Sequence, residues 1–353
     1  AFMDSIPMVI ISGQVQSHLI GTDAFQETDM IGVSRPIVKH SFTVDKQENI
    51  ANIVAEAFHI ATSGRQGPVL IDVPKDLTNP DELFDFVYPD KVHIRSYNPP
   101  TKPENHQVSR AVDAILASER PVIYAGGGTI SSNASKELRE LNDLIDAPVT
   151  NTLMGLGVFP GTHKRFLGML GMHGTYQANM AMHNADLIIA LGARFDDRIT
   201  NAPDKFAPRA KVIHFDVDHS SVSKIIEADI AVFGQIKDSL QAINNHLKTK
   251  IDEIDNEKLA PWHQQISDWK EKHGLNHDLY KIEDDSGPIL PQAAVQHIYQ
   301  ESKGKAFVTS DVGQHQMFAA QYYHFDEPRK WINSGGLGTM GFGLPSAMGV
   351  KLA

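Results

Sequence analysis

The sequence is most informative at Asp186-Leu187-Ile188-Ile189-Ala190-Leu191-Gly192-Ala193-Arg194-Phe195-Asp196-Asp197-Arg198. Its first half is a short apolar run, which is typical of a strand buried on both faces of a parallel sheet. Glycine, two arginines and two aspartates follow, so this strand is expected to deliver charged side chains to its carboxyl end. Open α/β sheets bind their ligands at that edge. The stretch therefore predicts an α/β domain with a ligand site directly after this strand.

Two neighbouring segments carry the same kind of signal. An apolar run at residues 211–215 ends in Asp216-Val217-Asp218, and residues 168–175 form a glycine-rich loop. Glycine lets the backbone approach a ligand closely. We expect the three loops to converge on one sheet edge and to form a cofactor site there.

The rest of the chain alternates between predicted strands and helices, which indicates doubly wound parallel sheets of the α/β class. Apolar runs predict strands at residues 6–12, 67–74, 121–125, 148–152, 187–191, 211–215, 231–233 and 306–309. Helical patterns are predicted at residues 49–63, 108–117, 132–145 and 290–299, with a further helix that ends at Leu247 and a small-residue helix after Pro345.

A chain of 353 residues is too long for one ordinary domain. We expect residues 1–85 to be the end of a first α/β domain and residues 86–104 to be a linker. A central domain is expected at 105–250, a second linker at 251–286 and the start of a third domain at 287–353. The first and last domains are expected to be incomplete, so the chain is interpreted as a fragment of a longer protein.

Composition excludes several functional classes. The chain has 32 Lys and Arg against 43 Asp and Glu, a net charge of −11, which argues against non-specific nucleic-acid binding. It has no cysteine, so disulfides, thiolate chemistry and cysteine-ligated metals are excluded. It contains neither an apolar run of membrane-spanning length nor a signal peptide at its first residues, so no membrane association is expected.

On residue type alone, each candidate motif has a competing interpretation. Residues 126–129, glycine-rich between a strand and a helix, could cradle a phosphate, but a tight turn is favoured. Arg194 and Arg198 could clamp a diphosphate or form a salt-bridge cluster with the nearby aspartates, and ligand contact is slightly favoured. Asp216 could accept from ribose hydroxyls or cap a helix, and these alternatives are equally weighted.

The remaining candidates are histidines, methionines and one glycine-rich loop. His173 and His315 could transfer protons, although structural histidines are commoner. Met172 and Met340 are, on type alone, core residues. The loop at residues 335–343 favours close approach to a phosphate or cofactor over a plain linker, because it is so rich in glycine.

Taken in order, these segments resemble a known family. Residues 21–28, 67–76, 171–175, 192–200, 311–315 and 334–345 are similar to the catalytic subunits of acetohydroxyacid (acetolactate) synthases, which are thiamine-diphosphate enzymes. The resemblance implies an architecture of pyrimidine-binding, central and diphosphate-binding domains. It implies decarboxylation of pyruvate and carboligation to pyruvate or 2-oxobutyrate, giving 2-acetolactate or 2-aceto-2-hydroxybutyrate, the first common step of branched-chain amino acid synthesis. Its implied cofactors are thiamine diphosphate, Mg²⁺ and FAD, the last without net redox change.

The resemblance also implies roles for individual residues. The positions that match FAD contacts are Arg65, Gly126, Gly127, Gly128, Thr152, Leu153, Met154, Gly171, His173, Gly192, Arg194, Asp196, Arg198 and Asp216. Those that match thiamine-diphosphate contacts are Gly313, Gln314, His315, Gly338 and Met340, with Met340 as the apolar wedge that bends the cofactor. Phe25, Gln26 and Lys75 match the substrate channel, and Gln26 is the one assigned to the reacting groups.

Two elements of the family's active site are expected outside this chain. The glutamate that activates the thiamine pyrimidine would precede Ala1, and the magnesium-binding segment would follow Ala353. No metal ligand is therefore assigned, and the 353 residues alone are expected to be inactive.

Two rival functions remain open at this stage. One is a flavin-reducing enzyme of the pyruvate oxidase type, and the other is a non-catalytic nucleotide-binding module. The resemblance further implies a homodimer or tetramer, a small regulatory subunit and a location in the bacterial cytoplasm.

Overall fold

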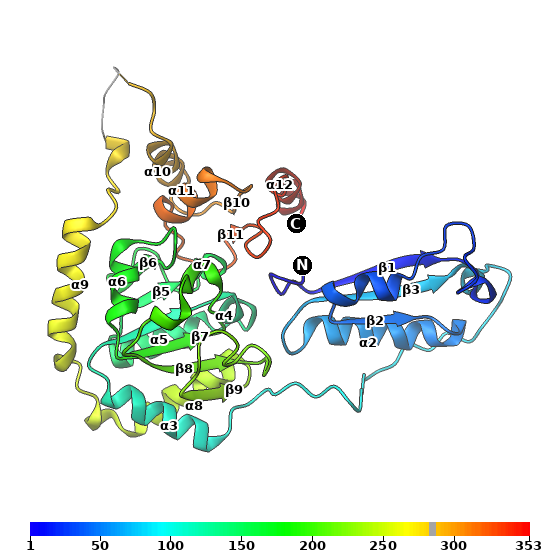
Figure 1. Cartoon of the computed structure of the whole chain (residues 1–353), viewed down its shortest axis with the longest axis horizontal. Coiled ribbons are helices and arrows are strands. Elements are labelled where there is room, and N and C mark those ends of the chain that lie inside the picture. The colour runs from blue at the N-terminus through cyan, green and yellow to red at the C-terminus, as the bar shows by residue number, and fades with distance from the viewer. Residues whose placement is uncertain (282–286) are drawn as a thin grey trace. The chain divides into compact units, whose positions relative to one another are not determined.

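A computed structural model describes residues 1–281 and 287–353. The chain forms two compact units, Ala1–Pro99 and Pro100–Ala353, and each is described by itself (Figure 1). No helix within the described residues combines the length and the apolarity needed to cross a bilayer.

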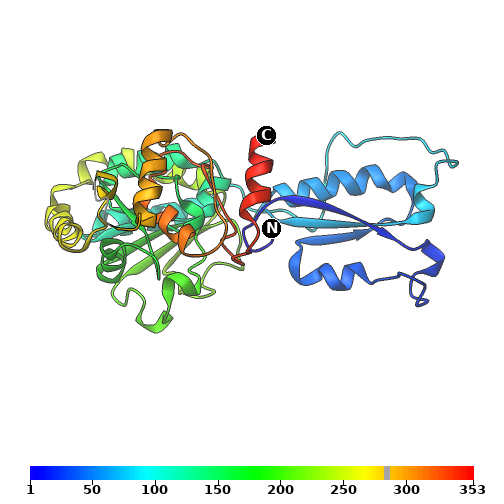
Figure 2. The ribbon, with the colours of Figure 1, turned by 90° about the horizontal axis from the view of Figure 1, so that it is seen from above.

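The first unit is built on a three-stranded parallel sheet. Its order is β1 (Met8–Gln14), β3 (Pro68–Pro74) and β2 (His40–Thr43). The central strand β3 is apolar along nearly its whole length because both of its faces are covered. Helix α2 (Ile50–Thr62) packs on one face, and the short α1 (Met30–Ser34) lies on the other, as Figure 2 shows.

The second unit contains a six-stranded parallel sheet. Its order is β6 (Phe166–Met169), β5 (Val149–Asn151), β4 (Pro121–Ala125), β7 (Leu187–Leu191), β8 (Lys211–Asp216) and β9 (Ile230–Phe233). The chain runs outward from β4 to one edge and then returns to place β7 on its other side. This reversal between β4 and β7 is a topological switch point, where open α/β sheets form their ligand crevice.

Helices cover both faces of this sheet (Figure 1). On one face, α3 (Asn105–Ala117), α5 (Ser135–Ile145) and α8 (Ile236–Thr249) share a core with Ile123 and Ile189. On the other, α6 (Tyr176–Asn184) and α9 (Ala260–His273) share a core with Val122 and Ile188. Adjacent strand residues face opposite ways, so the unbroken apolar strands supply both cores.

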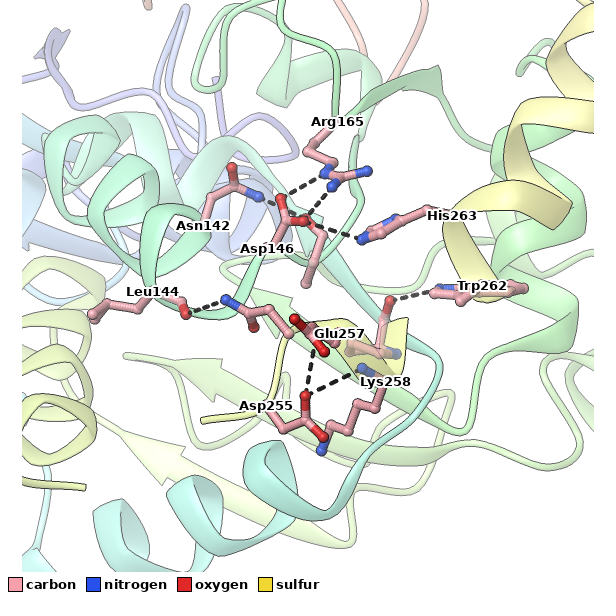
Figure 3. A network of polar contacts seen from close by, with 12 residues as sticks. Asn142, Leu144, Asp146, Arg165, Asp255, Glu257, Lys258, Trp262 and His263 are labelled. Atoms are coloured by element: carbon pink, nitrogen blue, oxygen red, sulfur yellow. Dashed lines mark hydrogen bonds and ion pairs between the residues drawn. The ribbon is translucent and has the colours of Figure 1, made fainter. Parts of the chain in front are cut away.

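Polar contacts join the end of α5 to helix α9 and to the segment that precedes α9, as drawn in Figure 3. Asp146 accepts from Arg165 Nε at 2.6 Å, and its Oδ2 lies 3.3 Å from His263 Nε2, an ion-pair distance without hydrogen-bond geometry. Trp262 Nε1 donates to Pro121 O at 3.2 Å, and Asn256 Nδ2 donates to Leu144 O at 3.1 Å. The region expected to be a second linker thus contains helix α9, which packs on the central sheet.

The last part of this unit holds α10 (Pro291–Ser302), β10 (Val308–Thr309), α11 (Gln314–Tyr322), β11 (Trp331–Ile332) and α12 (Gly343–Leu352). Strands β10 and β11 pair in parallel. Tyr323, Phe325 and Trp331 share an apolar cluster with Leu156 and Met169 of the central sheet region. The loops after β5 and after β11 are thereby brought close together.

The predicted fold class, parallel doubly wound sheets with flanking helices, is confirmed. Some element boundaries were wrong. The helix predicted at 132–145 begins later, as α5 at Ser135. A separate short helix, α4 (Gly127–Ser131), precedes it, and Asn133 adopts a left-handed backbone with φ 55° between the two. The strand predicted at 306–309 contains only Val308–Thr309. Residues 79–104 contain neither helix nor strand, as expected of a linker, but the predicted domain boundaries themselves stay predictions.

Candidate functional site

The site is built where β4 and β7 end side by side. Gly126 N donates to Leu191 O at 2.9 Å, and Gly128 N donates to Gly192 O at 3.1 Å. A Cβ on Gly126 would lie 2.3 Å from Gly192 O, and one on Gly192 would lie 2.6 Å from Gly128 Cα. Only glycine permits this contact of backbone with backbone. The N–H groups of Gly126 and Gly128 already donate within the fold, and Gly127 opens helix α4 in place of the tight turn favoured from the sequence.

The loop after β5 supplies polar atoms at the same edge. Thr152 N donates to Ala125 O at 3.0 Å, which fixes this loop beside β4. Thr152 Oγ1 and both amide atoms of Asn151 are buried and have no hydrogen-bond partner among the described residues. Buried polar groups are normally paired, so these atoms are candidates to contact a bound molecule. Thr152 was predicted from its sequence position, whereas Asn151, an amide at the end of an apolar strand, was not.

Met154 connects this loop with the glycine-rich loop after β11. A Cβ on Gly127 would lie 3.3 Å from Met154 Cβ, and one on Gly335 would lie 2.4 Å from Met154 Sδ. Asn333 Nδ2 lies 3.8 Å from the same sulfur. The loop after β5 is therefore in contact with the start of the glycine-rich loop that carries Gly338 and Met340.

The loop after β7 presents Arg194 at the switch point. Gly192 and Phe195 have positive φ angles of 55° and 54°, and the Phe195 ring is buried beneath the loop. Arg194 is half-buried, and its side chain makes no hydrogen bond or ion pair with any residue in the described part of the chain. Such a guanidinium is suited to an anionic group such as a diphosphate.

The charged residues that follow are used differently. The Asp196 side chain accepts from Arg198 N at 2.9 Å and caps α7 (Asp197–Thr200). Arg198 Nε lies 3.7 Å from Asp197 Oδ2 on the surface, where both side chains are largely exposed. Arg198 therefore forms the ion pair of the salt-bridge alternative, whereas Arg194 remains available to contact a ligand.

Asp216 ends β8 and is buried. Its Oδ1 accepts from Asp218 N at 2.9 Å in a turn, and no helix starts there in the described residues. The helix-cap alternative was therefore wrong.

His214 lies two residues before Asp216 in the same strand. It is fully buried, and its Nε2 lies 2.9 Å from Ala193 O. Burial lowers the pKa of His214 to about 4. His214 was not predicted as a site residue, although a histidine inside an apolar strand is a visible signal in the sequence.

The loop between β6 and α6 joins the same edge. Met172 N donates to Arg198 O at 2.8 Å, and Gln321 Nε2 donates to His173 O at 2.8 Å. Gly171 exchanges hydrogen bonds with the Asn179 amide, which fixes the loop on α6. Met172 is 61% exposed and Met340 is 80% exposed, so the expectation of core methionines was wrong for both. Both thioethers face outward from the loops that carry them.

The residues predicted to contact thiamine diphosphate lie on two facing loops of the last segment. Gly313, Gln314 and His315 begin α11, and all three are exposed. Gly338 has a φ of 61°, and a Cβ there would lie 3.6 Å from Val312 Cγ1. This approach brings the glycine-rich loop beside the residue that precedes Gly313.

The predicted substrate-channel residues lie in the first unit. Phe25 is 89% exposed, and Gln26 has a φ of 65°, in the loop after β1. Lys75 is exposed directly after β3, at the same carboxyl edge. Arg65 precedes β3, and its Nε donates to Ser5 Oγ at 3.1 Å at the opposite edge of this sheet. Within this unit Arg65 is therefore not brought together with Phe25 and Lys75.

A metal centre is not formed by these residues alone. Within residues 1–281 and 287–353 there is no cluster of three or more His, Asp or Glu side chains placed to hold a metal ion.

Residues 108–243 match the family described as "Thiamine pyrophosphate enzyme, central domain". Residues 311–353 match "Thiamine pyrophosphate enzyme, C-terminal TPP binding domain". All 353 residues align at 55% identity with the acetolactate synthase large subunit of Buchnera aphidicola subsp. Schlechtendalia chinensis, covering 61% of that protein. They align at 51% identity with the acetolactate synthase isozyme 3 large subunit of Escherichia coli K12, again covering 61%.

The acetolactate synthase large subunit of Haemophilus influenzae is 51% identical over 358 aligned positions, and 61% of it is covered. The chain thus spans about three-fifths of the length of these curated relatives. Two domains match in the family's order, and the likeness to large subunits extends from the first residue to the last. The chain therefore belongs to the thiamine pyrophosphate enzymes and, within them, is similar to acetolactate synthase large subunits.

Proposed function

We propose that this chain is part of the catalytic subunit of an acetolactate synthase. Its reaction would be decarboxylation of pyruvate and transfer of the two-carbon unit to pyruvate or 2-oxobutyrate, giving 2-acetolactate or 2-aceto-2-hydroxybutyrate. The observation that carries this proposal is identity of 51–55% over all 353 residues with large subunits of that name.

Thiamine diphosphate is the proposed catalytic cofactor, supported by the match of residues 311–353 to a thiamine pyrophosphate-binding domain. When bound, it supplies the electron sink for decarboxylation. Gly313, Gln314 and His315 would bind it from one loop, and Gly338 and Met340 from the other. The exposed thioether of Met340 is suited to pack against an apolar ring, because it is flexible and polarisable.

FAD is the proposed occupant of the switch point. The unpaired guanidinium of Arg194 would bind its diphosphate, Thr152 would donate or accept through Oγ1, and Asp216 would accept from ribose. The further residues in this proposal are Gly126, Gly127, Gly128, Leu153, Met154, Gly171, His173, Gly192, Asp196, Arg198 and, from the first unit, Arg65. Mg²⁺ is proposed to accompany thiamine diphosphate.

The first unit is proposed to contribute the substrate channel through Phe25, Gln26 and Lys75. The protruding aromatic ring of Phe25 offers an apolar wall, and the Lys75 ammonium offers a partner for a 2-oxo acid carboxylate. Gln26 would orient the reacting groups through its amide.

The test is product identification with the full-length gene product, thiamine diphosphate, Mg²⁺ and FAD. Incubation with pyruvate should give acetolactate while the flavin stays oxidised. Acetate or acetyl phosphate with bleached flavin would instead indicate an oxidase. Tight FAD binding without any turnover of pyruvate would contradict catalysis altogether.

We also propose a homodimer or tetramer, a small regulatory subunit and a cytoplasmic location. The name "large subunit" borne by the relatives supports the regulatory partner. Co-expression of the full-length protein with the small subunit encoded in the same genome should give one complex on size-exclusion chromatography. Separate elution at micromolar concentration would count against this partner.

A further inference from the structure

Asp311 connects the two loops that flank the proposed thiamine-diphosphate site. It lies two residues after the end of β10, and its Oδ1 accepts from Val312 N at 2.8 Å. Gly341 N donates to both carboxylate oxygens, at 2.9 and 3.0 Å. Gly343 N donates to Oδ2 at 3.3 Å. One carboxylate thus accepts from its own loop, from the glycine-rich loop and from the first residue of α12.

The backbone of the glycine-rich loop is shaped for these contacts. Gly341 has a φ of 87°, a conformation that strains other residues. A Cβ on Gly343 would lie 2.6 Å from Asp311 N. The two loops therefore approach at a distance that only glycine allows, and the Asp311 carboxylate satisfies the N–H groups that this approach brings inward.

The loop is fixed at its other end as well. Ser334 Oγ accepts from Thr339 N at 3.1 Å and lies 3.1 Å from Thr339 Oγ1. Met340 stands between this contact and Gly341, with its side chain 80% exposed. Its backbone is thus held on both sides, by Ser334 before it and by Asp311 after it.

We propose that Asp311 is a positioning residue that holds the glycine-rich loop in its cofactor-binding shape and so sets the place of Met340. This inference rests on the proposed use of thiamine diphosphate. Asp311 would act through the backbone of residues 341–343 and would not itself touch the reacting atoms. This role explains why a carboxylate that accepts from three backbone N–H groups lies beside a site proposed for thiamine diphosphate, which is itself an anion.

The charge state of Asp311 agrees with this role. Hydrogen bonds from Val312 N and then Gly341 N hold the pKa of its carboxyl below the usual range, against a smaller opposing effect of burial. Gly343 N and His315 act in the same direction. The side chain is therefore ionised at neutral pH, when charge-assisted hydrogen bonds to N–H groups are strongest.

The experiment compares Asp311→Ala and Asp311→Asn with the wild-type full-length protein. Hydrogen–deuterium exchange would be followed on peptides covering residues 335–344, and thiamine diphosphate affinity would be measured by titration with Mg²⁺ present. Asp255→Asn is the matched control, because Asp255 also accepts from two backbone N–H groups, of Glu257 and Lys258, away from the site.

In Asp311→Ala, exchange at Gly341 and Gly343 should be faster by about tenfold, and the Kd for thiamine diphosphate should rise by about tenfold. Asp311→Asn keeps one acceptor oxygen and should show intermediate values, which serves as the test should the alanine variant fold poorly. The KM for pyruvate at saturating cofactor should change by less than about twofold in both, since Asp311 is not placed against substrate.

Unchanged exchange in both variants would overturn the inference alone. Faster exchange with unchanged cofactor affinity would also overturn it, because the loop would then not need this shape for binding. Absence of thiamine diphosphate binding by the wild-type protein would overturn the proposed function first and this inference with it.

Discussion

His214 joins the ends of two neighbouring strands through one buried hydrogen bond. Its Nε2 lies 2.9 Å from Ala193 O, and because a carbonyl oxygen can only accept, Nε2 carries the proton. Nδ1 is buried without a hydrogen-bond partner in the described part of the chain. The neutral ring thus fixes the backbone directly before Arg194. Burial outweighs this hydrogen bond and lowers the pKa of His214 to about 4.

This lowered pKa predicts a specific loss of stability in acid. Between pH 6.5 and 4 the unfolded chain binds a proton at His214 and the folded chain does not, so stability falls as pH falls. The stabilisation is complete above pH 6.5, and from there to pH 5 the loss is roughly 2 kcal/mol. Urea unfolding at pH 7 and pH 5 measures it, with His214→Gln as the comparison.

Glutamine can donate from Nε2 to Ala193 O but does not titrate, so the variant should lose less stability between the two pH values by that amount. Equal losses in both proteins would show that His214 does not titrate on unfolding in this range. His277, whose pKa burial also lowers to about 4, is present in both proteins and cancels in the comparison.

Glu27 closes the loop that carries Phe25 and Gln26. Its carboxylate accepts from Gly21 N and, at 3.0 Å, from Ala24 N. These hydrogen bonds lower the pKa of Glu27, so it is ionised at neutral pH. In Glu27→Ala, amide exchange across residues 19–28 should be faster by about tenfold, because both N–H groups lose their acceptor.

Hydrogen–deuterium exchange with peptide-level detection measures this effect, and Glu27→Gln should be intermediate because it keeps one oxygen. Glu48→Ala, in the same unit and outside this loop, serves as the control. Protection at Gly21 and Ala24 that survives in Glu27→Ala would mean that another group closes the loop.

Helix α9 is the element whose role was least evident from sequence. Trp262 is buried, donates to Pro121 O and packs in the core that includes Ile188. Replacing it with alanine should lower the free energy of unfolding by about 3–5 kcal/mol, because it leaves a large cavity and an unpaired carbonyl. Urea denaturation followed by circular dichroism measures this.

Trp262→Phe keeps an aromatic ring but loses the N–H donor, and should cost less. Lys272→Ala, an exposed change in the last turn of α9, should stay within about 0.5 kcal/mol of wild type. A loss below about 1 kcal/mol for Trp262→Ala would show that α9 is dispensable for this core.

The elements that could be predicted from sequence are those whose signal is local. Strand β7 was predicted with its observed bounds, because five apolar residues followed by glycine are unambiguous. The break between α4 and α5 could not be predicted, since it depends on a left-handed Asn133 in a helical pattern. The packing of α9 could not be predicted either, because its polar sequence gives no sign of which sheet its two tryptophans and Ile266 would contact.

The same distinction applies to the site. Residue types at strand ends pointed to the edge where Arg194 and Gly126 meet, but they did not show that Arg198 would pair with Asp197 while Arg194 stays unpaired. The Asp311 contacts depend on two loops about thirty residues apart in sequence, and only the fold brings them together.

At the scale of the whole molecule, the chain divides at residues 99 and 100 into its two compact units. Before that point, residues 79–93 form neither helix nor strand and are almost all exposed. Ile94 and Tyr97 then pack against the first unit, and Tyr97 OH donates to Ser63 O at 2.9 Å. The segment between Thr78 and Ile94 is therefore the least protected stretch near the end of the first unit, with few backbone hydrogen bonds to break before a protease can bind it.

This exposure predicts where the protein is first cut by trypsin. Lys91 lies in the unprotected segment, Arg95 stands between the two anchored side chains, and Lys102 precedes a proline that blocks cleavage. Brief digestion followed by mass spectrometry should give fragments that end at Lys91 and begin at Val92 before any other pair of comparable size. In Lys91→Gln these fragments should not form, and the first cut should move to Arg95 and come later, because it must first release Tyr97 from Ser63. Early cleavage within β4 or β7, with residues 79–93 left intact, would show that this segment is covered in the native protein.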